Sequence, residues 1–331
     1  MLSFVAVALV LLPVRDADLS FKTTDGIELH GTFVEPEHAA GTKLSAVLLL
    51  PGSGPTDRDG NQPPALIANT LKDIADALAA KGIASYRFDK RAAHSNSAIW
   101  PKDPAKLDDF FAFEHFRDDA ISAYEAMRVQ PSVDPGRCAM LGHSEGGLIT
   151  ITVAAKLGKE KLPAIALLGT AGRPLDFVIE DQISALLRKQ TSDPAVIKFY
   201  TDALQKGIDY EKANGKTPPG LPPGLQPLFS PGTGKILQSY FTIDPATTIE
   251  SYSGDVLLMQ GEMDNQISVT KDFPLLKKAL AGRSSGALTA VTIPNASHNL
   301  KQVGAIGDPG IDGPVVPEAL GQVVKWASKI P

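Results

Sequence analysis

The sequence predicts an α/β fold, in which a mostly parallel β-sheet is flanked by helices. Short, uninterrupted apolar runs alternate along the chain with longer amphipathic stretches. Such runs are typical of strands that are buried on both faces of a parallel sheet. With 331 residues, of which 43% are hydrophobic and 21% charged, the chain is long enough to bury a large core.

Residues 1–18 are expected to form a signal peptide or a lone apolar segment. The apolar run at 4–12 has the length of a signal-peptide h-region and is too short to span a bilayer, so we expect no stable membrane insertion. No Lys or Arg precedes this run, and residues 13–18 offer no good small-X-small cleavage site. We expect a periplasmic or secreted protein if the segment is a signal peptide, and a cytoplasmic one otherwise.

Residues 21–34 are predicted to form two strands joined by a turn at 24–26, which gives the sheet an antiparallel start. Strands and helices then alternate, and right-handed crossovers place the helices on both faces of the sheet. The predicted elements are strand 46–50, helix 65–81, strand 83–88, helix 116–130, strand 137–141, a helix through 148–155 and strand 164–169.

The alternation breaks between residues 173 and 252, where we expect an inserted helical cap. A helical stretch at 177–188 is followed by polar helix-like segments and by a run rich in Pro and Gly at 217–224. An insertion at this point of the sheet is expected to lie over the strand ends. The core, 19–172 and 253–331, then resumes with strand 256–261, helix 271–280, strand 287–293 and helix 318–329.

The pattern Gly-X-Ser-X-Gly at 142–146 makes Ser144 the candidate nucleophile. It lies between a predicted buried strand and a predicted helix, which is the context of a nucleophile elbow. Gly142 and Gly146 lack the Cβ atoms that would collide where the backbone turns sharply. An ordinary structural turn is the alternative interpretation of the bare motif, and the flanking elements favour catalysis.

Serine is a weak nucleophile at neutral pH, so catalysis needs a base and an acid that orients it. His298 follows the predicted strand 287–293, and Asp264 follows the predicted strand 256–261. The chain order Ser144, Asp264, His298 is that of α/β-hydrolases and differs from the chymotrypsin and subtilisin orders. The sequence therefore predicts an α/β-hydrolase fold with a Ser-Asp-His triad.

Other interpretations of these residues stay open at this stage. Asp264 could cap the helix that follows it, with Glu262 as the triad acid. Among the six histidines, His94 competes with His298, because its loop could also border the pocket. We expect His94, and His143 beside the nucleophile, as substrate-contact candidates.

Acyl transfer also needs donors aimed at the developing oxyanion, and this fold takes one from the N–H of the residue after the nucleophile, here Glu145. The other is expected in the loop 51–61, which follows the strand 46–50. Ser53 is our choice of donor, with Gly54 second and as a candidate substrate contact. The Asp-Arg-Asp triplet at 57–59 is expected to brace this loop through ion pairs.

Several loop motifs combine in one chain. They read Gly-Ser-Gly-Pro-Thr-Asp-Arg-Asp-Gly-Asn at 52–61, Arg-Phe-Asp-Lys-Arg at 87–91, Gly-His-Ser-Glu-Gly-Gly at 142–147 and Ala-Gly-Arg-Pro-Leu at 171–175. Together they resemble EstD-type bacterial carboxylesterases, which are grouped with serine aminopeptidase or prolyl-oligopeptidase-like α/β-hydrolases. The resemblance extends from about residue 21 to the C-terminus.

The resemblance implies Ser144 as nucleophile, Asp264 as acid, His298 as base, and the N–H groups of Ser53 and Glu145 as the oxyanion hole. One departure concerns the loop after residues 87–91. The family usually continues Gly-X-Gly-X-Ser there, whereas this chain reads Ala-Ala-His-Ser, so the pocket near that loop is expected to differ in shape.

The function predicted is that of a serine carboxylesterase acting on short- to medium-chain esters, with a small-molecule ester as partner and no metal or organic cofactor. A serine peptidase or amidase, and a non-catalytic binding protein with this fold, are the alternatives.

The net charge of −5 and the absence of a basic run with interleaved aromatics argue against nucleic acid as a partner. The single cysteine, Cys138, forms no intramolecular disulfide and is expected to lie in a buried strand. The sequence indicates no oligomeric state.

Overall fold

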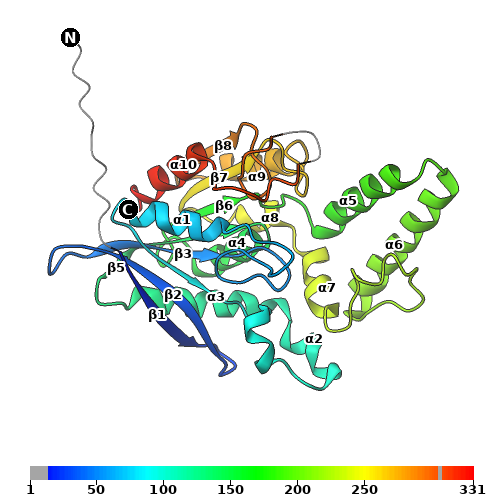
Figure 1. Cartoon of the computed structure of the whole chain (residues 1–331), viewed down its shortest axis with the longest axis horizontal. Coiled ribbons are helices and arrows are strands. Elements are labelled where there is room, and N and C mark those ends of the chain that lie inside the picture. The colour runs from blue at the N-terminus through cyan, green and yellow to red at the C-terminus, as the bar shows by residue number, and fades with distance from the viewer. Residues whose placement is uncertain (1–13, 305–307) are drawn as a thin grey trace, which may run out of the picture.

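In the computed structural model, which describes residues 14–304 and 308–331, eight strands form one sheet in the order β1-β2-β4-β3-β5-β6-β7-β8 (Figure 1). Strands β3 to β8 run parallel to one another, and β2 runs antiparallel to both of its neighbours. The predicted α/β class and the mostly parallel sheet are confirmed. The strands are β1 (Val14–Lys22), β2 (Glu28–Pro36), β3 (Leu44–Leu50), β4 (Ala84–Phe88), β5 (Val133–His143), β6 (Ala164–Leu168), β7 (Asp255–Gly261) and β8 (Leu288–Ile293).

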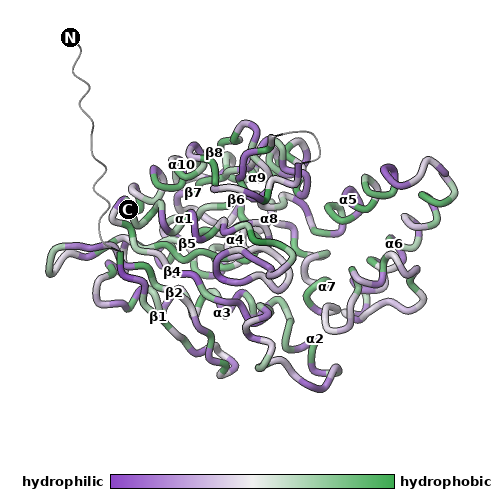
Figure 2. The backbone as a smooth tube through the Cα atoms, in the orientation of Figure 1, coloured by the Kyte–Doolittle hydropathy of each residue, from purple (hydrophilic) through white to green (hydrophobic). Residues whose placement is uncertain are grey.

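The central strands are buried on both faces, which explains their unbroken apolar sequences. In β3, Leu48 packs into one core and Leu49 into the other. In β5, Met140 and Leu141 divide in the same way, because successive side chains of a strand point to opposite faces. Complete burial of each such side chain contributes about 1.5–3 kcal/mol. Figure 2 shows hydrophobic stretches along these strands as well as along the helices.

Helices cover both faces of the sheet. Helices α1 (Thr70–Ala79) and α10 (Pro317–Ala327) pack together over one core, and α3 (Phe113–Arg128), α4 (Glu145–Leu157) and α9 (Phe273–Ala281) cover the other. Between β4 and α3 the chain forms short turns of helix that we had not predicted. They are η1 (His94–Ile99), η2 (Pro104–Lys106) and α2 (Leu107–Phe110).

Four helices lie between β6 and β7 in the described chain. Helices α5 (Leu175–Gln190) and α6 (Pro194–Asn214) project away from the sheet, whereas α7 (Gly234–Thr242) lies closer to it (Figure 1). Helix α8 (Pro245–Ile249) packs against α4 and α9. The segment thus starts and ends at the sheet while its middle extends outward.

The helix predicted at 65–81 starts later, at Thr70, and the first part of that prediction is wrong. Asn61 and Asn69 close the preceding loop: Asn61 Nδ2 donates to Asn69 Oδ1 at 2.9 Å, and the Asn69 N–H donates to Asn61 Oδ1 at 2.7 Å. Asn69 adopts a left-handed backbone with φ of 51°. These hydrogen bonds hold the chain out of a helix until Thr70.

The N-terminal prediction lies mostly outside the described residues, because residues 1–13, including the apolar run, are not among them. Residues 14–18 form the first half of β1. They pair with β2, so that Val14 lies opposite Pro36 and Asp18 lies opposite Thr32. Across the described chain, no helix is long and apolar enough to cross a membrane. Cys138 is buried in β5, as predicted.

Candidate active site

Ser144 occupies a sharp turn between β5 and α4. Its φ of 56° and ψ of −118° are strained for a residue with a side chain. The Ser144 N–H donates to the Leu168 carbonyl at 2.8 Å, which ties the turn to β6. A Cβ on Gly142 would lie 2.0 Å from the Gly146 oxygen, and one on Gly146 would lie 2.4 Å from the Leu50 oxygen. Both flanking glycines are therefore required by close backbone approach.

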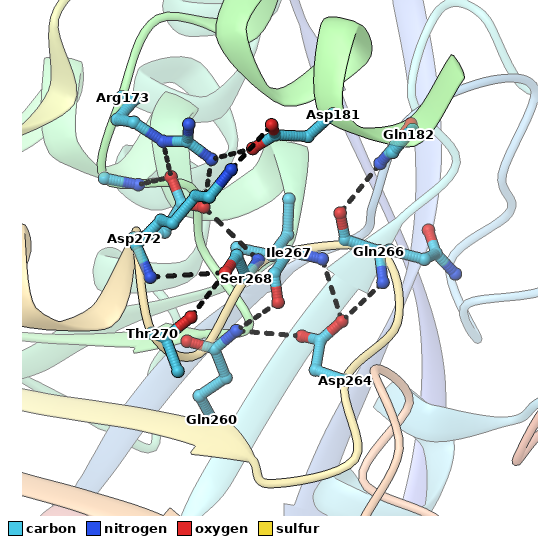
Figure 3. Close-up of polar contacts among 12 residues, drawn as sticks. Arg173, Asp181, Gln182, Gln260, Asp264, Gln266, Ile267, Ser268, Thr270 and Asp272 are labelled. Atoms are coloured by element: carbon cyan, nitrogen blue, oxygen red, sulfur yellow. Dashed lines mark hydrogen bonds and ion pairs between the residues drawn. The ribbon is translucent and has the colours of Figure 1, made fainter. Parts of the chain in front are cut away.

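The loops after β7 and β8 bring Asp264 and His298 together. His298 Nδ1 lies 2.9 Å from Asp264 Oδ2, and the two side chains are only 4% and 0% exposed. The other carboxylate oxygen accepts from the backbone N–H groups of Gln266 and Ile267 at 2.9 Å each (Figure 3). Gln260 Nε2 adds a hydrogen bond to Oδ2 at 3.2 Å. The carboxylate is thus held from several sides while it contacts the imidazole.

Electrostatics keep Asp264 ionised. Burial raises the pKa of this carboxyl, but the charge of His298 and the hydrogen bonds outweigh burial and hold the pKa below its usual range. The bonds to two backbone N–H groups also show that Asp264 caps its own loop while it orients the histidine. Glu262, the alternative acid, is exposed and accepts from Thr292 Oγ1 at 3.0 Å.

The imidazole of His298 lies beside the elbow. A Cβ on Gly169, the residue after β6, would be 3.2 Å from His298 Nδ1, so the absent side chain leaves room for the ring. The His143 and His298 rings have centroids 4.8 Å apart. His143 immediately precedes Ser144, so this ring contact places His298 near the elbow. Ser144, Asp264 and His298 thus all lie at the carboxyl ends of the parallel strands β5, β7 and β8.

His143 supports the loop that carries His298. Its Nε2 lies 2.9 Å from the His298 carbonyl oxygen, and burial, followed by the nearby His298, lowers its pKa to about 4. His143 is 6% exposed and is not part of the cavity lining. The structure therefore gives His143 a supporting position where the sequence suggested a substrate contact.

The loop after β3 lies against the nucleophile. A Cβ on Gly52 would be 3.3 Å from Ser144 Cβ. The next carbonyl, that of Ser53, accepts from Thr56 Oγ1 at 2.6 Å and from Gln62 Nε2 at 2.9 Å, so the turn is hydrogen-bonded internally. Across the described residues the Ser53 N–H has no protein acceptor. Ser53 and Ser144 line the same cavity.

Ion pairs anchor the same loop to β4 and to the residue that follows it, as predicted. Arg58 Nη2 donates to Asp89 Oδ2 at 2.8 Å, and Arg87 Nε donates to Asp59 Oδ1 at 2.6 Å. Asp57 differs from the prediction, because its Oδ1 accepts from two backbone N–H groups of its own loop. Arg58 and Asp59 thus tie the loop to other segments, whereas Asp57 stabilises the loop from within.

The remaining substrate-contact candidates are His94, which follows β4, and Gly54, which lies in the loop after β3. His94 is exposed at the start of η1, with its ring 6.2 Å from that of Trp100. Gly54 has φ of +76°, and a Cβ there would lie 3.1 Å from Gln62 Nε2. Neither residue lines the cavity beside Ser144.

This cavity has a volume of about 90 Å³. Its walls are mostly apolar and combine the core loops with the inserted helices. The lining residues are Ser53, Ser144, Glu145, Leu148, Ala171, Arg173, Leu175, Tyr240, Pro245 and Ile267. A more open and more polar groove of about 550 Å³ adjoins it through Arg173 and Ile267, between α5 and the loop after β7.

Arg173 anchors the start of the insertion beside the cavity. Its guanidinium donates to both oxygens of Asp272 at 3.0 and 2.9 Å, and to Asp181 on α5 at 3.0 Å (Figure 3). The Asp272 side chain is 0% exposed. The motif at 171–175 contributed to the family resemblance, but the sequence assigned no role to Arg173 and did not indicate its carboxylate partners.

Sequence reasoning missed the side chains of Lys90, Glu145 and Tyr240. Lys90 Nζ donates to Glu145 Oε2 at 2.6 Å, and the Tyr240 hydroxyl donates to Glu145 Oε1 at 2.5 Å. Burial, followed by the neighbouring carboxylate, raises the pKa of Tyr240 well above its usual value. The motif at 87–91 contained a signal for Lys90, whereas nothing in the sequence pointed to Tyr240.

Within the described residues, no cluster of three or more His, Cys, Asp or Glu side chains is arranged to hold a metal ion.

The sheet, the elbow after β5, and the Asp–His pair after β7 and β8 define an α/β-hydrolase fold. The model of the Hydrolase_4 family, described as serine aminopeptidase S33, matches residues 67–202. This match and the fold support the α/β-hydrolase superfamily and hydrolase activity. No curated protein matches the sequence.

Solved structures share the fold at low identity. Est1E from Butyrivibrio proteoclasticus is 15% identical, with a TM-score of 0.56 over 94% of this chain and 98% of that one. The structure of a DcsB complex with its substrate analogue is 16% identical, with a TM-score of 0.57 over 96% and 99%. An acylaminoacyl peptidase from Pyrococcus horikoshii is 15% identical, with a TM-score of 0.55 over 96% of this chain and 42% of the peptidase.

Proposed function

We propose that the protein is a serine carboxylesterase that hydrolyses short- to medium-chain esters through an acyl-enzyme on Ser144. The observation that carries this proposal is the small apolar cavity lined by Ser144, in a chain whose Asp264 and His298 form a buried pair. Its charged lining residues already have protein partners: Glu145 is bound by Lys90, and Arg173 by Asp272. An uncharged acyl group suits such a lining.

The reaction follows from the arrangement. Ser144 Oγ attacks the ester carbonyl while His298 takes its proton, and Asp264 stabilises the imidazolium. The N–H groups of Ser53 and Glu145 receive the oxyanion of the tetrahedral intermediate. His298 then protonates the leaving alcohol as the carbon–oxygen bond breaks. Water hydrolyses the acyl-enzyme by the same steps, and Ser144 recovers its proton.

The size of the cavity supports short acyl groups. About 90 Å³ is small beside the roughly 300–1,000 Å³ of pockets that enclose drug-sized ligands. Leu175, Tyr240 and Pro245 of the inserted segment close one side of it. We therefore propose that residues 173–252 act as a cap that limits acyl length.

A peptidase is the second candidate, because the matching family model is described as a serine aminopeptidase. The same triad cleaves amides when the leaving nitrogen is protonated. An aminopeptidase also needs an anionic group for the free amine of its substrate. Glu145 is the carboxylate in the cavity lining, and Lys90 and Tyr240 already occupy both of its oxygens. This pairing favours the ester.

A burst-phase assay with p-nitrophenyl esters from acetyl to long chain tests the proposal, with Ser144→Ala and a p-nitroanilide run alongside. We expect a burst and turnover of the short esters, no activity in the variant, and at most slow cleavage of the anilide. Cleavage of the anilide at comparable efficiency would support the peptidase. Silence on every ester, together with no labelling of Ser144 by a fluorophosphonate, would indicate a binding protein.

A further inference from the structure

A buried lysine lies against the proposed oxyanion hole. Lys90, in the loop after β4, donates from Nζ to the Gly52 carbonyl oxygen at 2.6 Å and to Glu145 Oε2 at 2.6 Å. The Lys90 side chain is 5% exposed, and that of Glu145 is 7% exposed. A buried ammonium is thus shared between one peptide oxygen and one carboxylate.

The Gly52 carbonyl oxygen is significant because the same peptide group carries the Ser53 N–H, one of the two proposed oxyanion donors. The Gly52 carbonyl and the Ser53 N–H belong to one planar trans peptide, so they point in opposite directions. An ammonium bound to the oxygen therefore fixes the direction of the N–H. It also draws electron density toward the oxygen, which makes the N–H a stronger donor in a site of low dielectric constant.

Lys90 also binds the side chain of Glu145, whose own backbone N–H belongs to the proposed oxyanion hole. A carboxylate so close to a developing negative charge would oppose that charge. Lys90 offsets the carboxylate, and the hydroxyl of Tyr240 occupies its remaining oxygen. One ion pair thus links both halves of the oxyanion hole and connects them to α7 of the insertion.

We propose that Lys90 is a positioning residue, which orients and polarises the Ser53 N–H through the Gly52 carbonyl and neutralises Glu145. The inference rests on the proposed serine hydrolase activity and deepens it. Lys90 acts on the transition state, where the oxyanion forms, and has little influence on the binding of the neutral ester.

The double variant Lys90→Met/Glu145→Met tests this role. It removes both charges and so avoids the unpaired buried charge that a single substitution leaves. Loss of a complete oxyanion donor lowers kcat by about 10²–10³-fold, so loss of its orientation is expected to lower kcat/KM by about 10–100-fold with little change in KM. The affinity for a trifluoromethyl ketone, whose adduct with Ser144 carries an oxyanion, should fall by the same factor.

Lys156→Met is the matched control. Lys156 lies on α4, like Glu145, and forms an exposed ion pair with Asp118 at 2.9 Å. Its kcat/KM and ketone affinity should stay within about twofold of the wild type, as is usual for exposed pairs. Thermal melts of all variants distinguish loss of activity from loss of fold.

If the double variant does not fold, Lys90→Gln decides, because glutamine retains hydrogen-bond donors and removes the charge. Parallel losses of kcat/KM and ketone affinity in Lys90→Gln would support the proposal. Wild-type values of both in a folded variant would show that Lys90 only stabilises the fold. A wild-type protein without esterase activity or Ser144 labelling would overturn the proposed function itself, and this inference with it.

Discussion

The carboxylate of Asp264, in a loop at the carboxyl end of a strand, and that of Glu211, in the inserted helix α6, are satisfied very differently. Around Asp264 both carboxylate oxygens are hydrogen-bonded, and His298 is held by its ring and its carbonyl. In the insertion, Glu211 is 0% exposed, and neither of its carboxylate oxygens has a partner within the described structure. Phe199, on the same helix α6, is 58% exposed.

The comparison separates two tasks. The strand-end loops hold the reacting groups by overlapping hydrogen bonds, so a change there is expected to affect the rate with every substrate. The insertion contributes Leu175, Tyr240 and Pro245 to the cavity wall, so a change there is expected to affect which substrates fit. The predictions below test this division, beginning with the largest expected effect.

Ser144→Ala should abolish turnover, with a loss in kcat of about 10⁶-fold, because no nucleophile remains to form the acyl-enzyme. Steady-state assays with the preferred p-nitrophenyl ester and fluorophosphonate labelling measure the effect. Ser97→Ala, at an exposed residue of η1, is the control and should retain labelling. Persistent labelling in Ser144→Ala would place the nucleophile elsewhere.

Asp264→Asn should lower kcat by about 10⁴-fold while the protein still folds, because the amide favours the wrong tautomer of His298 and removes the compensating charge. KM should change little. Glu262→Gln is the matched control, since this neighbouring carboxylate is exposed. Equal losses in both variants, or none in Asp264→Asn, would remove Asp264 from the triad.

Glu211→Gln should remove a pH dependence of stability that originates in the insertion. Burial raises the pKa of Glu211 to about 8, so the folded chain retains a proton that the unfolded chain releases near pH 4.5. The folded state binds more protons in this window, and its stability should therefore fall by on the order of 3 kcal/mol as pH rises from 5 to 8.

Urea denaturation at several pH values measures this effect. The difference in unfolding free energy between wild type and Glu211→Gln should grow in favour of the variant as pH rises. Esterase activity at pH 7 should be similar in both, because Glu211 does not line the cavity. A difference that is independent of pH would show that Glu211 is ionised in the folded chain.

Leu175→Ala should produce the smallest change and the most selective one. Removing this wall of the cavity should raise kcat/KM for butyryl relative to acetyl esters by about tenfold, since a methylene in an apolar pocket is worth about 1–3 kcal/mol. Leu186→Ala, an exposed position of the same helix α5, should leave the ratio unchanged. A uniform loss on all esters in Leu175→Ala would assign α5 to the catalytic framework.

Much of the sheet and of the candidate triad could be predicted because the signals are local. A strand buried on both faces needs an unbroken apolar run, and a sharp strand-to-helix turn needs glycines on both sides of Ser144. Asp264 and His298 were predictable because parallel strands deliver their following loops to one edge of the sheet. Each of these inferences depends on short stretches of sequence and on chain order.

The remainder was decided by contacts between distant segments. Asn69 interrupts a helical pattern because its partner Asn61 lies across the loop. Tyr240 is 95 residues from Glu145, and Lys90 is 55 residues from it, so no local pattern connects them. Their pairing depends on how the insertion returns to the sheet.

The sequence by itself determined the fold class and the candidate catalytic residues, because backbone geometry and burial demand specific residue types at specific spacings. The tertiary structure decided the cavity shape and the partners of its charges, because these arise only when separate elements pack together.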